Sequence, residues 1–223
     1  MVKLYFKTLP VVCFLACLAP VSADAQCYRK GSLLISVSEG STFSNYTTND
    51  ISGSKPVLVH SEFICGDRDP LIIEYALTKR LGLGMSAGTD IFKVNASKFY
   101  HAEAPDNTMK LFTNELTLDV NYHVFVNKRL DLSVFLSTGL FTVNYTNKQS
   151  DISQQYNASG NILRFGTKAR YYFWKRLGAF GMLSSYTGTS SPKQVKGNTV
   201  GQNYSTTIDG MAIEAGLCFR ILR

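Results

Sequence analysis

The sequence has few of the residues that mark disulfide-rich, metal-binding or helical membrane proteins. Five of its 223 residues are Cys, three are His and one is Trp. Only Cys27, Cys65 and Cys218 follow residue 25, and an odd number this low is no disulfide framework. After residue 25, charged or polar residues interrupt every apolar stretch, so no segment predicts a membrane-spanning helix. No basic run exceeds two residues, which argues against a nucleic-acid partner.

The sequence also lacks the spacings typical of catalytic and cofactor sites. No Cys/His pattern suggests zinc, and LGLGMSAG at 81–88 is a Gly-rich stretch with no helix after it. His60 and His101 fall in expected loops, and no Ser–His–acid set stands on an apolar face. We therefore predict no enzyme, no cofactor and no metal site, and we interpret His123 as a member of a charge network.

The first 25 residues have the layout of a secretory signal. A basic start, MVKLYFK, precedes the apolar stretch TLPVVCFLACLAPV, and the small residues ADA follow. The apolar part is too short to span a bilayer as a helix. We predict cleavage after Ala25, which leaves one domain over residues 26–223. A lipoprotein signal at Cys17 is the rival interpretation, although Phe14 stands where such signals usually have an aliphatic residue.

Alternation of apolar and polar residues predicts β-strands with one apolar face. In PLIIEYALTK (70–79), Leu71, Ile73 and Tyr75 share one face, whereas Ile72 and Glu74 share the other. The same pattern marks 110–125, 130–141, 161–173 and 207–222. A softer alternation marks three more segments, of which the last has no assignable faces: 31–40, 81–94 and 177–188.

The tripeptide KRL returns three times, about 48 residues apart, between two predicted strands. Each copy leaves only a few residues to turn in and so marks a tight hairpin. Its basic residues would contact phospholipid head groups or simply keep the turn solvated. The other strand pairs are joined by longer segments with the composition of exposed loops: 41–69, 95–109, 147–160 and 189–206. Short turns at one end and long loops at the other predict an all-β fold, a closed antiparallel eight-stranded up-and-down transmembrane β-barrel.

The alternation alone leaves open which face meets lipid, because a soluble lipocalin barrel has the opposite polarity. Small residues crowd the polar face, as suits a narrow lumen: Gly82, Gly84, Ser86 and Gly88. Aromatic residues lie near the strand ends at the turn side, where an interfacial girdle is expected: Tyr122, Tyr171, Phe173 and Phe219. We therefore predict that the apolar face is the outer one.

Charged residues on the inner face would have no bulk water and must pair. An eight-stranded barrel is just wide enough for side chains. We predict a salt-bridge network that plugs the lumen, formed by Glu74, Asp90, Glu115, Asp119, Asp131, Arg164, Lys168, Arg170, Glu214 and Arg220.

Eight strands, KRL turns, polar loops and the final AGLCFRIL together resemble the small outer membrane barrels of Gram-negative bacteria, of the OmpA-barrel, OmpX and OmpW type. The chain departs from them in its last residues: Phe219 is followed by Ile221, Leu222 and Arg223, where such chains often end on an aromatic residue used in assembly. The resemblance implies a location in the outer membrane, contact with its lipid and lipopolysaccharide, and insertion by the barrel assembly machinery.

The predicted function is a structural or surface-interaction role, in which any extracellular ligand would bind through the four long loops. A net charge of +7 for the whole chain is compatible with anionic lipid nearby. The alternatives are a narrow porin or OmpW-like conduit for small or hydrophobic solutes, and a soluble periplasmic binder. A disulfide between Cys27 and Cys218 is a further hypothesis, because the first and last strands must pair to close the barrel.

Overall fold

A computed structural model describes residues 28–54, 56–95, 108–149, 152–196 and 204–221. The predicted signal peptide, its cleavage site and Cys27 lie outside these residues. Within them Cys218 is a buried free thiol, and the pairing with Cys27 stays a hypothesis. No helix in the described ranges is long and apolar enough to cross a membrane.

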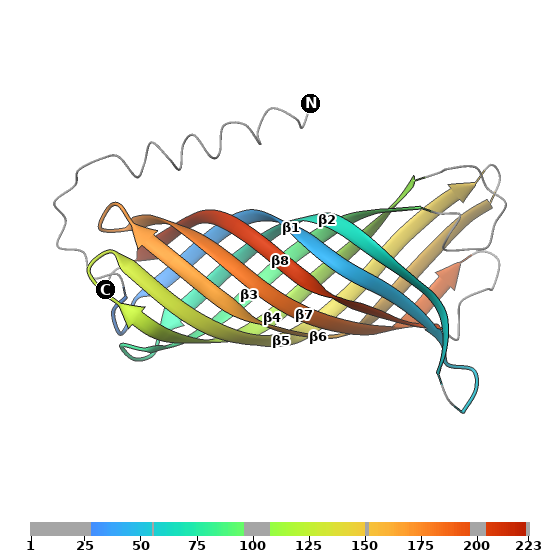
Figure 1. The fold of residues 1–223 in the computed structure, drawn as a ribbon, viewed down its shortest axis with the longest axis horizontal. Coiled ribbons are helices and arrows are strands. Elements are labelled where there is room, and N and C mark those ends of the chain that lie inside the picture. Colours follow the sequence, from blue (N-terminus) through green and yellow to red (C-terminus); the bar gives the residue numbers. More distant parts are fainter. Residues whose placement is uncertain (1–27, 55, 96–107, 150–151, 197–203, 222–223) are drawn as a thin grey trace.

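Eight antiparallel strands close into one barrel in which each strand pairs with its neighbours in sequence and β1 pairs with β8 (Figure 1). The predicted fold class is therefore confirmed. The strands are β1 (Leu33–Asp50), β2 (Val57–Ala76), β3 (Leu81–Asn95), β4 (Thr108–Val126), β5 (Leu130–Gln149), β6 (Ile152–Tyr172), β7 (Leu177–Lys196) and β8 (Tyr204–Ile221).

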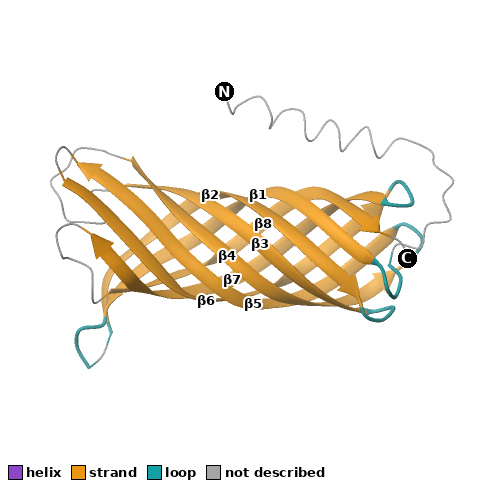
Figure 2. Ribbon diagram, turned by 180° about the vertical axis from the view of Figure 1, so that it is seen from behind, coloured by secondary structure: helices purple, strands orange, loops and turns teal. Residues whose placement is uncertain are grey.

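The strands are inclined to the barrel axis, as the oblique ribbons in Figure 2 show. Following paired residues once around the barrel from Leu33 leads back to β1 at Phe43, ten residues further along. A stagger of this kind fixes strand tilt and diameter together, and eight strands leave an interior that side chains can fill.

The short turns lie together at one end, here called the turn end (Figure 2). In the β2–β3 turn the Thr78 hydroxyl accepts hydrogen bonds from the backbone N–H groups of Arg80 and Leu81. In the β4–β5 turn the Asn127 side chain accepts the equivalent pair from Arg129 and Leu130. A side-chain acceptor before the basic pair thus fixes two of the three KRL turns.

Apolar side chains cover the outside of the barrel next to the turn end. On β4, the exposed fractions are 46% for Leu116, 67% for Leu118 and 47% for Val120, whereas the residues between them are buried in the lumen. The band ends toward the opposite end, here called the loop end, where polar residues are exposed on the outer face: Asp67, Asp69, Asn114, Asn161 and Asp209. The predicted outward apolar face is confirmed in this half of the barrel.

Beyond this band the strands continue toward the loop end, so the predicted loops are wrong in extent. Between β1 and β2 only residues 51–56 lie outside strands, against a predicted loop of 41–69. Most of 147–160 and 189–206 is likewise strand, and 96–107 of the predicted loop 95–109 is outside the described residues. Strands of 18 to 21 residues, apart from β3 with 15, exceed the roughly 9–11 that cross a bilayer.

The interior of the loop-end half is mainly apolar. It holds a cluster of buried side chains that includes Ile64, Phe92, Leu111, Val143 and Ile208. The exposed Lys93 and the partly exposed Thr142 lie on the outer face of the same strands. The loop-end half therefore has the polarity of a water-exposed barrel with its own small core.

The structure also corrects the predicted face of one residue after β6 and shows which residues of β7 face the lumen. Phe173, predicted on the outer apolar face, is 8% exposed. It follows the last residue of β6, where the alternation ends, and packs edge-on against Trp174. In β7, where the sequence left the faces open, the lumen-facing residues are Phe180, Met182, Ser184 and Tyr186.

Candidate functional site

Charged side chains lie buried in the lumen of the turn-end half, most of them in two clusters. Among the described residues, five Arg or Lys and six Asp or Glu are buried inside the barrel. They are Arg68, Arg164, Lys168, Arg170 and Arg220 with Glu74, Asp90, Glu115, Asp119, Asp131 and Glu214. All ten residues predicted from the sequence lie here, joined by Arg68, which was not predicted.

The lower cluster, nearer the turn end, consists of Glu74, His123, Asp131 and Arg170. Arg170 donates through Nη1 to Asp131 Oδ2 at 3.0 Å and through Nη2 to Glu74 Oε2 at 2.5 Å. His123 contacts the other oxygen of each carboxylate: Nδ1 lies 2.6 Å from Asp131 Oδ1, and Nε2 lies 2.8 Å from Glu74 Oε1. The four side chains therefore form a closed ring contributed by β2, β4, β5 and β6.

This ring fits a protonated imidazole. A neutral imidazole has one N–H group, whereas both His123 nitrogens face carboxylate oxygens. With His123 cationic, the described lumen contains six positive and six negative side chains. An electrically balanced interior is the condition under which so many charges can be buried.

The upper cluster consists of Arg68, Asp90, Glu115, Arg164 and Glu214, and Arg68 lies at its centre. Its guanidinium donates through Nε to Glu214 Oε1 at 2.9 Å, through Nη1 to Asp90 Oδ1 at 3.0 Å and through Nη2 to Glu115. Arg164 donates to the second oxygen of Glu115 at 2.9 Å. One side chain thus joins carboxylates from β3, β4 and β8.

Neutral side chains supply further hydrogen bonds to the charged groups of the upper cluster. Thr113 donates its hydroxyl to Asp90 at 3.0 Å, and Ser38 donates to Glu214 at 3.1 Å. The Arg164 guanidinium also bonds Ser184 and lies over the Tyr186 ring, 4.4 Å from its centroid. The carboxylate oxygens are therefore shared between cations and hydroxyl donors, as buried charges require.

Three sequence-predicted members bond to neutral groups. Lys168 donates to Asn121 Oδ1 at 3.1 Å and lies 4.7 Å from the Phe135 ring centroid. Asp119 accepts from the Thr117 hydroxyl at 2.9 Å. Arg220 lies at the turn end, where it donates to the Lys175 carbonyl oxygen at 2.5 Å.

Tyr28 packs over the lower cluster at the turn end of the lumen. It precedes β1 and stacks on His123, with 3.5 Å between ring centroids and 27° between ring planes. Burial, reinforced by the nearby Glu74 carboxylate, raises the pKa of the Tyr28 phenol above its usual range. The phenol is therefore neutral and covers the lower cluster as an aromatic lid. In the sequence, the only feature that could have indicated this role is the position of Tyr28 just before the first strand.

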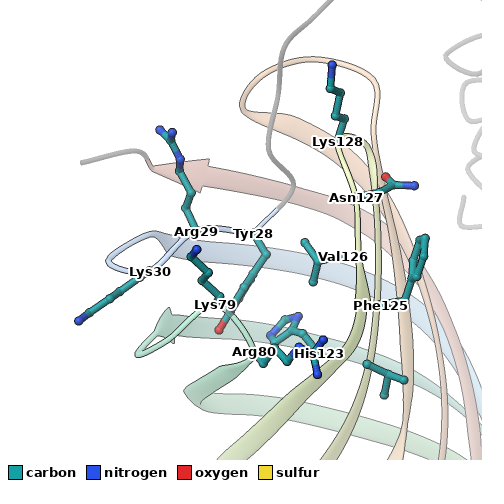
Figure 3. Close-up of a pocket in the computed structure, with 11 residues that line it drawn as sticks. Tyr28, Arg29, Lys30, Lys79, Arg80, His123, Phe125, Val126, Asn127 and Lys128 are labelled. Carbon is teal, nitrogen blue, oxygen red and sulfur yellow. The ribbon is translucent and has the colours of Figure 1, made fainter.

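A cavity of about 900 Å³ lies outside this lid, between the residues before β1, the β2–β3 turn and the end of β4 with its turn. Figure 3 shows Tyr28 beside His123, with Lys79 and Arg80 close to them and Lys30 and Lys128 extending outward. Among the described residues that line the cavity, five are basic and none is Asp or Glu: Arg29, Lys30, Lys79, Arg80 and Lys128.

The fold is that of known outer membrane barrels. No protein-family model matches the sequence, and no curated protein matches it. The crystal structure of the outer membrane protein OprG from Pseudomonas aeruginosa is similar with a TM-score of 0.55 at 11% identity, over 90% of this chain and 100% of that one. A major outer membrane protein from Thermus thermophilus gives a TM-score of 0.49 at 14% identity, over 85% and 99%.

The N-terminal β-barrel domain of Pseudomonas aeruginosa OprF gives a TM-score of 0.44 at 19% identity, over 86% of this chain and 98% of that one. At these identities the likeness concerns the fold alone. The architecture is that of the small outer membrane β-barrels, as the sequence resemblance implied.

Proposed function

We propose that the chain is an outer membrane β-barrel protein with a structural or surface-interaction role and a lumen closed to solutes. The support for a closed lumen is the set of buried side chains along its whole described length. Two charge clusters occupy the turn-end half, Tyr28 lies across its mouth, and an apolar cluster fills the loop-end half. The outer membrane fold and the apolar outer band support the location.

A catalytic role has no support in this arrangement. Both nitrogens of His123 are occupied by carboxylates inside the lumen, so this imidazole has no nucleophile to activate. The loop-end half instead offers a broad outer surface on strands that extend past the apolar band. Any external partner, such as lipopolysaccharide or a host molecule, would contact this surface and the segments that join its strands.

Chemical labelling of Cys65 can test the proposed membrane location. Cys65 is exposed on the outer face of β2, and Asp67 and Asp69, also exposed, separate it from the apolar band at Leu71. Carboxylates are costly in hydrocarbon, so Cys65 lies beyond the membrane on the loop side. In a Cys27→Ser variant expressed in a Gram-negative host, a maleimide polymer too large for porins should label Cys65 in intact cells. Cys218 is buried and should stay unlabelled.

The matched control moves the thiol to the opposite end. A Cys27→Ser, Cys65→Ser, Lys79→Cys variant carries its thiol on the β2–β3 turn, which is exposed at the turn end. We expect this variant to be labelled only after the outer membrane is permeabilised. Labelling of Lys79→Cys in intact cells, or of Cys65 only after permeabilisation, would refute the proposed orientation.

A further inference from the structure

The turn-end cavity has the chemistry of a binding site for a phosphate-bearing lipid. Its five basic residues come from three segments that lie far apart in the sequence, and they share one cavity because barrel closure brings the residues before β1 next to two hairpin turns. The acids nearest to it, Glu74 and Asp131, lie beneath Tyr28 and His123 and are bonded to His123 and Arg170. The described lining of the cavity therefore combines several basic side chains with no Asp or Glu, which favours an anionic ligand.

One wall of the same cavity is apolar and continuous with the outer surface of the barrel. Val124, Phe125 and Val126 line it at the end of β4. A register shift between His123 and Phe125 turns successive side chains outward, so Val124 is 57% exposed and Phe125 is 47% exposed. The outward Tyr122 precedes them on the same strand. A ligand in the cavity would thus meet cations on one side and the lipid-facing band on the other.

We propose that this cavity binds the head group of an anionic phospholipid from the leaflet that faces the turns. The phosphate would accept hydrogen bonds from the Lys79, Arg80 and Lys128 side chains. A Lys ammonium binds phosphate as a compact charge, and an Arg guanidinium can donate two parallel hydrogen bonds to it. The acyl chains would lie along Val124 and Phe125. Basic pockets at membrane surfaces recognise lipid head groups through the same combination of charge and adjoining apolar surface. The biological part of this inference rests on the proposed membrane location.

The third KRL turn provides a matched control. Lys175 and Arg176 are the same dipeptide at the same end of the barrel, but they lie outside the cavity lining. The test variant is Lys79→Gln with Arg80→Gln, and the control is Lys175→Gln with Arg176→Gln. Both pairs are exposed turn residues and remove the same charge. Heat-modifiable gel migration checks that each variant folds.

Binding is measured in neutral detergent with a fluorescent short-chain phosphatidylglycerol, so the result does not depend on where the barrel lies in the cell. We expect saturation at one lipid per barrel, about tenfold weaker binding in the Lys79, Arg80 variant, and a change under about twofold in the control. Unlabelled short-chain phosphatidylglycerol should compete, and the zwitterionic phosphatidylcholine should not.

Three results would overturn the inference. Equal weakening in both variants would show general charge attraction to the turn end. Equal competition by phosphatidylcholine would show binding through the apolar chains alone. Displacement by inorganic phosphate as effective as by the lipid would assign the cavity to a soluble phosphate. A failure of the Cys65 labelling test would leave these detergent results intact, so the two proposals fail separately.

Discussion

Replacing Arg68 with Met should lower the free energy of unfolding by about 3–5 kcal/mol. The substitution keeps an apolar stem but removes the guanidinium that joins Asp90, Glu115 and Glu214. Of these three, only Glu115 has a second Arg within the upper cluster. Asp90 and Glu214 would therefore stay buried with hydroxyl donors alone. Leaving buried charges without a cation strongly lowers the free energy of unfolding. Urea unfolding of the refolded barrel, followed by Trp174 fluorescence, measures the change.

The control for Arg68 is Arg176→Met, an exposed turn position that should change stability by less than about 0.5 kcal/mol. A second variant separates lost charge pairing from lost packing. Adding Glu214→Gln to Arg68→Met removes one of the stranded charges, so the double variant should regain at least about 1 kcal/mol. Equal losses in the Arg68 and Arg176 variants, or no recovery in the double variant, would contradict the central position of Arg68.

Replacing Gly139 with Ala should destabilise the barrel by about 3 kcal/mol or more. A Cβ atom at this position would overlap the carbonyl oxygen of Leu116 and lie 2.6 Å from the Cα of Thr117. Both atoms belong to the backbone of β4, which pairs with β5 here. The two strands would have to move apart at a place where every neighbour is fixed by barrel closure. Urea unfolding and refolding yield on heat-modifiable gels report the effect.

The matched control is Gly181→Ala on β7. Its Cβ would meet nothing closer than the Glu214 carbonyl oxygen at 3.9 Å, an ordinary contact. The same chemical change should therefore cost less than about 1 kcal/mol, or stabilise the strand slightly by removing a flexible residue. If Gly139→Ala and Gly181→Ala behave alike, the close approach of β4 and β5 is not what selects glycine at 139.

The turn-end half of the barrel could be predicted from the sequence because its strands follow one simple rule. Outward residues must be apolar and inward ones must satisfy each other, so Leu116, Leu118 and Val120 alternate with Glu115, Thr117 and Asp119. This alternation located the strands, their faces and the acids and bases of the lumen. The KRL turns marked the ends where two strands meet.

The loop-end half was mistaken for loops because the polarity of the strands inverts there. Beyond the apolar band the outer face becomes largely polar and the inner face becomes largely apolar: Phe92 and Val94 point inward while Lys93 points outward. Apolar and polar residues still alternate, but the apolar residues now face inward and the polar ones outward. A search for one continuous apolar face therefore ends each strand at the edge of the band.

Arg68 was missed for the same reason, since it falls in the predicted loop 41–69 just before Pro70. A proline usually begins or interrupts a strand, because it cannot donate to the ladder. In the structure β2 continues through Pro70, and the alternation that places Glu74 and Ile72 inward extends back to Arg68. Continuing the inward and outward alternation of β2 backward past Pro70 would have placed Arg68 on the inner face.

The central claim is that the lumen is filled, and single-channel conductance of the refolded mature protein in planar bilayers tests it most directly. Heat-modifiable gel migration of the same sample confirms that the barrel is folded. The two charge clusters, Tyr28 and the apolar loop-end core predict a folded band with no steady conductance. Reproducible conductance steps from the folded protein would contradict the filled lumen and make the chain a narrow pore.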